Sequence, residues 1–176
     1  MPTMLDLFAG RGGASRVMRE RGWRVVTVDV DPAFGCDVTG DVRTFRWDGG
    51  PVDLLWASPP CTEFARESMP WCRTGAVPDM NLVCAALFAV DRIKPRFWVI
   101  ENVRGSVPWI RALLGPPRFR SGPVYLWGNL PPGLLPQLRP WKSRLSSDRA
   151  DLRAEMPREL SHAIAIAVER ATTEAA

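Results

Sequence analysis

Asp6-Leu7-Phe8-Ala9-Gly10-Arg11-Gly12-Gly13 is the stretch that decides the fold, because it joins an apolar run to a glycine-rich turn. The run Met4–Phe8 predicts a β-strand, and the glycines let the chain turn sharply after it. The amphipathic segment Ala14–Arg21 then predicts a helix that ends at Gly22. Arg24–Val30 predicts the next strand. This order of elements predicts a βαβ unit with parallel strands.

The turn after the first strand is suited to a ligand that contains adenosine. Glycines at this place let the backbone approach a ligand closely, and Asp29, at the end of the next strand, can accept both hydroxyls of a ribose. A dinucleotide site is less well matched, because Ser15 stands where that fingerprint has its third glycine. In Gly40-Asp41-Val42 the carboxylate can accept an adenine amino proton while Val42 packs on the ring. Both segments can also be read as ordinary turns.

Apolar runs and amphipathic segments alternate through the first hundred residues, as is typical of a parallel sheet with helices on both faces. We expect strands at Val42–Phe45, Val52–Ala57, Phe97–Ile100 and Val124–Trp127, and helices at Met80–Arg92 and Met156–Arg170. Gly105–Ser147 is rich in proline (Pro116-Pro117, Pro131-Pro132 and Pro136), so we expect it to be irregular. The prediction is an α/β fold in a single domain over residues 1–176, without internal repeats.

Composition sets limits on the partner and the compartment. The chain has 176 residues, a net charge of +4 and a pI near 9.2, which permits a polyanionic partner. Nearly all its basic residues are arginines scattered along the sequence, a pattern that a GC-rich coding source explains equally well. The apolar stretch Leu82–Val90 is much shorter than the roughly 20 residues of a membrane helix. We therefore expect no membrane association, no targeting peptide and a cytoplasmic protein.

The four cysteines do not form the pattern of a zinc site. Cys36, Cys61, Cys72 and Cys84 include no CxxC pair, and His162 is the only histidine, so no metal site is expected. Disulfides are not expected in an intracellular chain. Each cysteine is then either a small apolar core residue or a reactive thiol.

A thiol and a carboxylate follow two neighbouring predicted strands. Ser58-Pro59-Pro60-Cys61 comes after Val52–Ala57, and Glu101-Asn102-Val103 comes after Phe97–Ile100. Since open α/β sheets bind ligands at the carboxyl ends of their strands, both groups are expected to flank one crevice.

These motifs, DLFAGxGG, PPC and ENV in this order, resemble those of the DNA cytosine-C5 methyltransferases. The resemblance runs from Met4 to Val103 and resumes at the last helix. It implies the Rossmann-like fold of class I S-adenosylmethionine-dependent methyltransferases. It also implies that S-adenosylmethionine is the methyl donor, with S-adenosylhomocysteine as product, and that DNA containing cytosine is the substrate.

The resemblance also assigns roles residue by residue. Cys61 is the expected nucleophile, Glu101 is expected to hold the N3 side of the cytosine, and Arg120 is expected to contact the base. The cofactor residues follow by position: Phe8, Gly10 and Gly12 at the methionine part, Asp29 at the ribose, Asp41 and Val42 at the adenine, and Pro59 and Ser161 as further contacts.

The chemistry explains why a thiol and an acid are needed together. Cytosine C5 becomes nucleophilic when a thiolate adds at C6, and this addition builds negative charge toward N3 that Glu101 can relieve. A free thiol titrates near pH ~8.5, so we expect either nearby arginines, with Arg66, Arg118 and Arg120 as candidates, or a nest of backbone donors to favour the thiolate of Cys61. The base must also leave the duplex stack to reach the thiol, so DNA has to be held by its backbone.

Some positions depart from the family pattern. Thr62 follows the nucleophile where glutamine is usual, Arg118-Phe119-Arg120 is a reduced form of Gln-x-Arg-x-Arg, and Leu160 replaces asparagine beside Ser161. The last change leaves open a modified sulfonium donor. The span between Val103 and Met156 is too short for the usual target-recognition domain. We therefore expect a monomer of phage or bacterial origin with a short or relaxed sequence context, unless a partner supplies specificity, and we expect residues 105–147 to contact DNA.

Three other functions stay open on the sequence alone. An N4-cytosine amino-methyltransferase uses a Ser-Pro-Pro-aromatic turn, but here Cys61 replaces the aromatic residue and Glu101 would have no role. A C5 methyltransferase of free cytosine nucleotides needs no recognition domain. A binding module without catalysis is the third, and the intact Cys61 and Glu101 argue against it.

Overall fold

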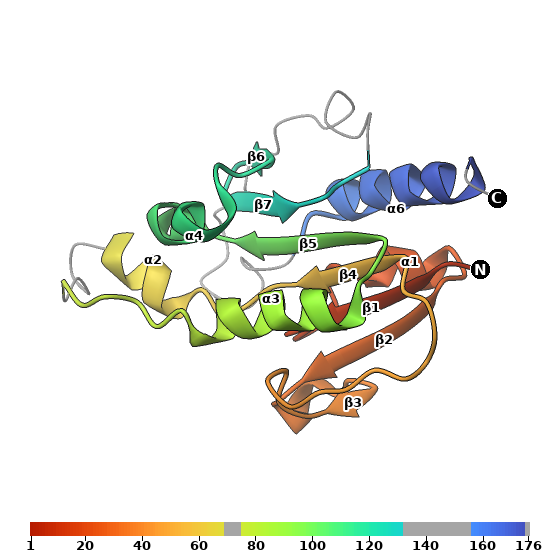
Figure 1. Ribbon diagram of the computed structural model, residues 1–176, viewed down its shortest axis with the longest axis horizontal. Coiled ribbons are helices and arrows are strands. Elements are labelled where there is room, and N and C mark those ends of the chain that lie inside the picture. The colour runs from red at the N-terminus through yellow and green to blue at the C-terminus, as the bar shows by residue number, and fades with distance from the viewer. Residues whose placement is uncertain (69–74, 132–155, 175–176) are drawn as a thin grey trace.

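The computed structural model describes residues 1–68, 75–131 and 156–174, which build a sheet of seven strands covered by helices on both faces (Figure 1). The strands lie in the order β3-β2-β1-β4-β5-β7-β6. All of them run parallel except β7, which is antiparallel to both of its neighbours, β5 and β6. This arrangement confirms the predicted fold class, a Rossmann-like α/β fold with a mostly parallel sheet.

The elements have the following bounds. The strands are β1 Thr3–Leu7, β2 Arg24–Asp29, β3 Val38–Thr39, β4 Leu54–Ala57, β5 Phe97–Asn102, β6 Phe119–Ser121 and β7 Val124–Gly128. The α-helices are α1 Arg16–Glu20, α2 Thr62–Ser68, α3 Asn81–Ile93, α4 Val107–Leu114 and α6 Arg158–Thr173, and the short 3₁₀ helices are η1 Pro32–Phe34 and η2 Arg104–Ser106.

The side chains of the central strands alternate between two cores. Met4, Trp56 and Val99 lie in the core with α1 and α6, whereas Leu5 and Leu55, one step along their strands, lie in the core with α3. Since successive residues of a strand point to opposite faces, one apolar strand supplies both layers. All five residues of β1 are buried, which puts this strand at the centre of the molecule.

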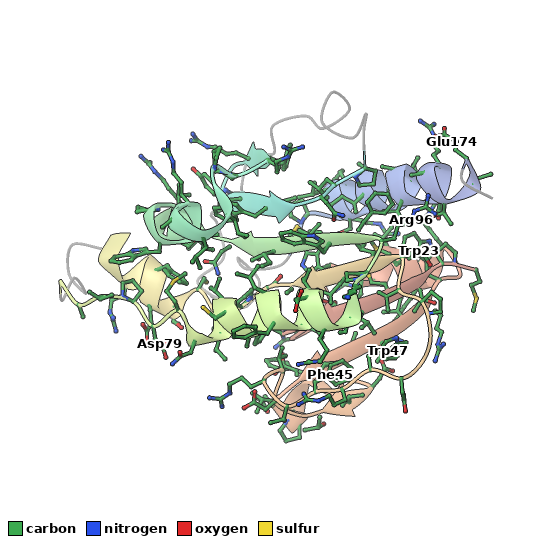
Figure 2. The ribbon with its side chains drawn as sticks, viewed as in Figure 1. Trp23, Phe45, Trp47, Asp79, Arg96 and Glu174 are labelled. Carbon is green, nitrogen blue, oxygen red and sulfur yellow. The ribbon has the colours of Figure 1, made fainter. Side chains whose placement is uncertain are left out.

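Polar contacts connect the C-terminal half of the last helix, α6, to residues that directly precede β2 and β5. Trp23 Nε1 donates a 2.9 Å hydrogen bond to Glu169, and the Arg96 guanidinium donates to the carbonyl oxygen of Ala171. Figure 2 shows Trp23 and Arg96 beside this helix. Segments from the start, middle and end of the sequence therefore meet on one face.

The predicted strand at Val42–Phe45 is wrong. The edge strand is β3, a few residues earlier, and the chain from Asp41 to Phe45 is a turn in which Asp41 Oδ1 accepts from the backbone N–H of Arg43 at 2.8 Å. Aspartate stabilises turns in this way, and here the effect outweighs the β-propensity of the segment. Val42 points into the α3 core and is 3% exposed.

The strand predicted at Val124–Trp127 is confirmed as β7, but the irregular structure predicted for the rest of Gly105–Ser147 is wrong as far as Ser121. This part holds α4 and the hairpin of β6 and β7, joined by Gly122 and Pro123. Pro108 is tolerated because it stands in the first turn of α4, and Pro116-Pro117 falls between elements. Pro132 and Pro136 lie outside the described residues.

The topology decides where a ligand can bind. From β1 the strand order runs one way to β2 and β3, and the other way to β4 and β5, so it reverses between β1 and β4. At such a point the loops after the two strands diverge and leave a crevice at their carboxyl ends. The Gly10 loop follows β1 and the Cys61 turn follows β4, so both border this crevice. In the described part of the chain no helix has the length and apolarity needed to cross a bilayer.

Candidate active site

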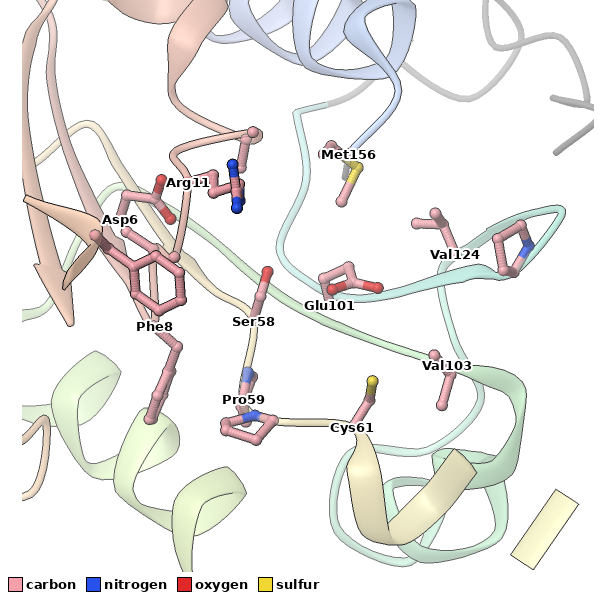
Figure 3. A pocket seen from close by; sticks show the side chains of 17 residues that line it. Asp6, Phe8, Arg11, Ser58, Pro59, Cys61, Glu101, Val103, Val124 and Met156 are labelled. Atoms are coloured by element: carbon pink, nitrogen blue, oxygen red, sulfur yellow. The ribbon is translucent and has the colours of Figure 1, made fainter. Parts of the chain in front are cut away.

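A cavity of about 290 Å³ lies at the carboxyl ends of β1, β4 and β5. The first loop, the turn after β4 and the end of β5 form its wall, and the β6–β7 hairpin and Met156 close it (Figure 3). The cavity brings together five of the residues predicted from the sequence, which are Phe8, Gly10, Pro59, Cys61 and Glu101. Its size is close to the lower end of ligand sites, roughly 300 Å³.

The loop after β1 has an unusual backbone. Phe8 adopts a φ of 58° in the left-handed region, followed by Gly10 at 52° and Gly12 at 70°. This conformation is common for glycine but rare for a bulky residue, and it costs about 1–3 kcal/mol. Strain of this kind persists where the surrounding structure holds it, and it is typical of binding sites. Gly12 lies in a smaller neighbouring cavity, which it lines together with Ser15 and Arg19.

Asp29 holds this loop from the adjacent strand. Its Oδ2 atom accepts a hydrogen bond of 2.9 Å from the backbone N–H of Gly10, and its Oδ1 atom accepts one of 3.0 Å from Asp31. Each carboxylate oxygen keeps a further lone pair, so the group can still accept from a ligand. Asp29 therefore lies beside the cavity and fixes its glycine loop.

Asp41 is paired with a neighbouring side chain. Its carboxylate receives the Arg43 Nε at 2.9 and 3.0 Å, and the Arg43 hydrogen bonds hold the pKa of Asp41 below its ordinary value. Val42 is part of the core, as described above. The structure does not bring these two residues into the cavity, and their adenine contact stays a prediction.

The turn that carries Cys61 is hydrogen-bonded to the end of β5. Asn102 Nδ2 donates a hydrogen bond of 3.0 Å to the carbonyl oxygen of Pro59, and the carbonyl oxygen of Cys61 accepts from Ala65 as α2 begins. The Cys61 thiol is free and half-buried. Its place therefore follows from β4, β5 and α2 together.

The pKa of Cys61 is raised, first by burial and then by the negative charge of Glu101. Its own backbone N–H acts in the opposite direction. This corrects the expectation that arginines lower it, since in the described part of the chain neither Arg66 nor Arg118 nor Arg120 is among the groups that shift it. The reason is geometric: Arg120 is exposed on β6 and stacks over the Tyr125 ring, with 5.4 Å between the guanidinium carbon and the ring centroid.

Glu101 faces Cys61 across the cavity, and Figure 3 shows both side chains pointing into the same space. Burial raises the pKa of Glu101 to about 7, and a hydrogen bond from Ser58 opposes this shift. The group therefore changes its protonation state near neutral pH. It is a carboxyl that can donate a proton as well as accept one.

Asp6 is a site residue that the sequence analysis missed. It is 1% exposed and lines the cavity, its Oδ2 atom has no hydrogen-bond partner among the described residues, and burial raises its pKa to about 7. An unsatisfied buried carboxyl oxygen is costly unless a ligand uses it. The signal was available, since Asp6 is the one acid in the apolar run Met4–Phe8.

Ser161 lies near the start of α6. It is completely buried, and its Oγ atom also has no hydrogen-bond partner within the described residues. It does not line the cavity, but Met156, which precedes the same helix, does. No group of three or more His, Cys, Asp and Glu side chains suited to a metal ion occurs in residues 1–68, 75–131 and 156–174.

Comparison with known proteins gives both sequence relatives and solved structures. No protein-family model matches the chain. A protein of Frog virus 3 (isolate Goorha) assigned as a DNA (cytosine-5)-methyltransferase is 30% identical, over 56% of this chain and 52% of its own length. The chain thus spans about half the length of this relative.

Two solved structures show lower similarity. One is a protein assigned as a DNA modification methyltransferase encoded within an Escherichia coli prophage, with 23% identity, a TM-score of 0.48, and coverage of 64% of this chain and 35% of that one. A methyltransferase of Entamoeba histolytica has 16% identity and a TM-score of 0.46, with coverage of 75% and 54%. The sequence relative confirms the resemblance drawn from the three motifs: this chain is similar to a DNA (cytosine-5)-methyltransferase over somewhat more than half of its length.

Proposed function

We propose that this chain is a DNA cytosine-C5 methyltransferase that uses S-adenosylmethionine and forms a covalent adduct through Cys61. The observation that carries the proposal is the meeting of Cys61 and Glu101 in one cavity with the Phe8–Gly10 loop. The similarity to the viral relative supports it. Neither the N4 mechanism nor a binding module explains why a thiol and a titrating acid share this space.

The residues around the first loop fit S-adenosylmethionine. The unsatisfied Asp6 oxygen lines the cavity below this loop, and a carboxylate there is suited to the ammonium group of the methionine part. Phe8, Gly10, Gly12 and Pro59 would surround that part, Asp29 would accept from the ribose, and Ser161 would approach from α6. When bound, the cofactor supplies an electrophilic methyl group.

Cys61 and Glu101 would divide the activation of the base between them. The Cys61 thiolate adds to C6 of the cytosine, and the electron pair of the C5–C6 double bond moves toward N3. A protonated Glu101 donates a hydrogen bond there and stabilises the developing charge. Because the charge of Glu101 raises the pKa of Cys61, protonation of Glu101 also makes the thiolate easier to form.

The charge distribution supports a nucleic-acid partner. Residues 102–147 contain seven basic residues and no acidic residue, so this segment alone exceeds the net charge of +4. Although the arginines are scattered in sequence, their uncompensated charge is concentrated here. Four of them lie in the described part of the chain, and all four are exposed: Arg104 on η2, Arg111 on α4, Arg118 just before β6 and Arg120 on β6. Val103 and Pro123, from the same part of the chain, line the cavity, so a DNA backbone held by these arginines would pass its mouth.

A single experiment tests the function. The protein is incubated with S-adenosylmethionine labelled in its methyl group and with duplex DNA, single-stranded DNA or deoxycytidine nucleotides, and the products are analysed by mass spectrometry. We expect 5-methylcytosine in DNA with the native protein and none with Cys61→Ser, which should retain cofactor binding by calorimetry. Cys84→Ser, which changes a half-buried thiol of α3, is the matched control. N4-methylcytosine, or product from nucleotides alone, would contradict the proposal.

A further inference from the structure

We propose that Ser58 is a positioning residue: its hydroxyl, with its single proton directed by Trp56, holds the Glu101 carboxyl group in the orientation in which it meets the N3 edge of the cytosine. This role rests on the proposed function and deepens it. Ser58 belongs to none of the roles assigned above, although it lines the same cavity.

The direction of the Ser58 proton follows from its two partners. The Trp56 Nε1–H group donates to Ser58 Oγ at 2.8 Å, and an indole nitrogen can only donate. Ser58 must accept this bond with a lone pair, which leaves its one proton to point toward Glu101, its cross-strand neighbour on the cavity wall. Trp56 is completely buried, so this donor has no competing water. With Glu101 as the acceptor, Ser58 would complete a chain of two hydrogen bonds, in which each polarises the next.

The register of the sheet brings the three residues together. In the parallel pair of β4 and β5, Trp56 lies opposite Val99 and Ala57 lies opposite Ile100, so the next positions are Ser58 and Glu101. Residues two apart on a strand share a face, which places Ser58 on the side of Trp56 and Glu101 on the side of Val99. Trp56 and Val99 belong to the same core with α1 and α6. Ser58 and Glu101 are therefore neighbours across β4 and β5, one position beyond the last paired residues, Ala57 and Ile100.

The backbone around Ser58 is held on both sides. Its N–H donates to the carbonyl oxygen of Leu7 at 3.2 Å, and the carbonyl oxygen of the next residue, Pro59, accepts from Asn102. Pro59 itself has a restricted φ. Ser58 thus has little freedom to move away from Glu101, which is what a positioning residue requires. In Figure 3 the Ser58 hydroxyl and the Cys61 thiol approach Glu101 from different sides.

The hydrogen bond also has a predictable effect on titration. Burial raises the pKa of Glu101 to about 7, and the Ser58 bond is the interaction that opposes this shift. Removing the hydroxyl should therefore raise the pKa further, because the charged carboxylate loses its donor. Glu101 would then stay protonated to higher pH, while its carboxyl group would lose its fixed orientation.

The decisive variant is Ser58→Ala, with Ser58→Thr as the conservative control that keeps a hydroxyl. The titration of Glu101 is followed by NMR on protein labelled with ¹³C at glutamate carboxyls, with Glu101→Gln to assign its signal. This readout needs neither DNA nor activity. We expect an upward shift of the Glu101 midpoint in Ser58→Ala, and a midpoint close to that of the native protein in Ser58→Thr.

The kinetic arm measures methyl transfer to DNA from pH 6 to 9. For Ser58→Ala we expect kcat to fall by about 10-fold to 100-fold at neutral pH, KM values to change little, and the alkaline limb to move to higher pH. Ser58→Thr should recover most of kcat.

If Ser58→Ala does not fold, Trp56→Phe tests the same interaction between Ser58 and Glu101, with a smaller shift of the Glu101 midpoint in the same direction. An unchanged Glu101 midpoint in the folded variants overturns the proposal. Failure of the native protein to methylate DNA would instead contradict the proposed function, with the titration still deciding the role of Ser58.

Discussion

Asn102 and Pro59 connect the two strand ends that carry the acid and the thiol. The Asn102 amide donates to the Pro59 carbonyl oxygen at 3.0 Å, while its side-chain oxygen accepts from Val103 at 2.9 Å. Asn102 is 1% exposed, so both bonds lie in the interior, away from bulk water. The distance between Cys61 and Glu101 therefore depends on a residue that need not touch the substrate.

Asn102→Ala should lower both stability and activity. We expect a loss of about 1–3 kcal/mol in the free energy of unfolding, because the Pro59 carbonyl and the Val103 amide lose their partner. The matched control is Asn129→Ala, which removes comparable bonds to Trp98 and Arg96 at the other end of β5. Urea denaturation should show that both variants lose stability. Measurements of kcat should show a larger loss of activity for Asn102→Ala than for Asn129→Ala. A kcat equally reduced in the two folded variants would refute a specific role for Asn102.

Asp29→Ala should weaken binding of S-adenosylmethionine by about 1–3 kcal/mol, since a charge-assisted bond to the ribose and the support of Gly10 are both lost. Asp31→Ala is the control, because the Asp31 carboxylate accepts from Ala33 at the start of η1 and not from the Gly10 loop. Calorimetry on the two variants decides the matter. Equal dissociation constants for Asp29→Ala and the native protein would separate Asp29 from the cofactor site.

Glu101 should make the protein less stable as the pH rises. Its pKa is about 7 in the folded protein against 4.5 ordinarily, so the folded state binds more protons. The stability that Glu101 contributes is complete below about pH 4.5 and is lost as the pH rises to about 7, by a few kcal/mol at most. Asp6 adds a change of the same sign. Urea denaturation at pH 5 and pH 7.5 should show a smaller difference for Glu101→Gln than for the native protein. The exposed control Glu174→Gln should leave that difference unchanged.

The arginines after β5 should set the salt dependence of DNA binding. Replacing Arg111 and Arg118 with alanine should reduce the slope of log affinity against log salt by about 2, roughly one unit for each lost phosphate contact. The control replaces Arg24, which stacks on Trp47, and Arg92, which donates to Phe45. Fluorescence anisotropy at several salt concentrations measures both slopes. Equal slopes for the two double variants would place the DNA elsewhere.

The sequence predicts the elements of the fold correctly where a segment has one clear pattern of apolar residues. Met4–Phe8 and Arg24–Val30 predict β1 and β2 nearly to the residue, because buried parallel strands are typically near-continuous apolar runs. Val42–Phe45 misled because its β-branched residues suit a strand, whereas the bonds of Asp41 and the burial of Val42 fix a turn. The helix α4 was missed because prolines at its two ends hid its apolar spacing.

The site was predictable in its motifs but not in its electrostatics. The positions of Cys61 and Glu101 follow from the strand ends. The pKa shift of Cys61 depends on burial and on Glu101, which only the folded chain reveals. The link from Trp56 through Ser58 to Glu101 joins residues that are close in space because of sheet register, and no spacing within the sequence signals it.

The left-handed backbone of Phe8 has a consequence for anyone who wishes to engineer this protein. Glycine at position 8 would relieve the strain at that φ, so a search that ranks variants by thermal stability alone would favour it. The same change would delete the aromatic ring from the cavity wall. Heat-resistant variants chosen without an assay would tend to lose this wall, so selections on this scaffold need cofactor retention as a second criterion.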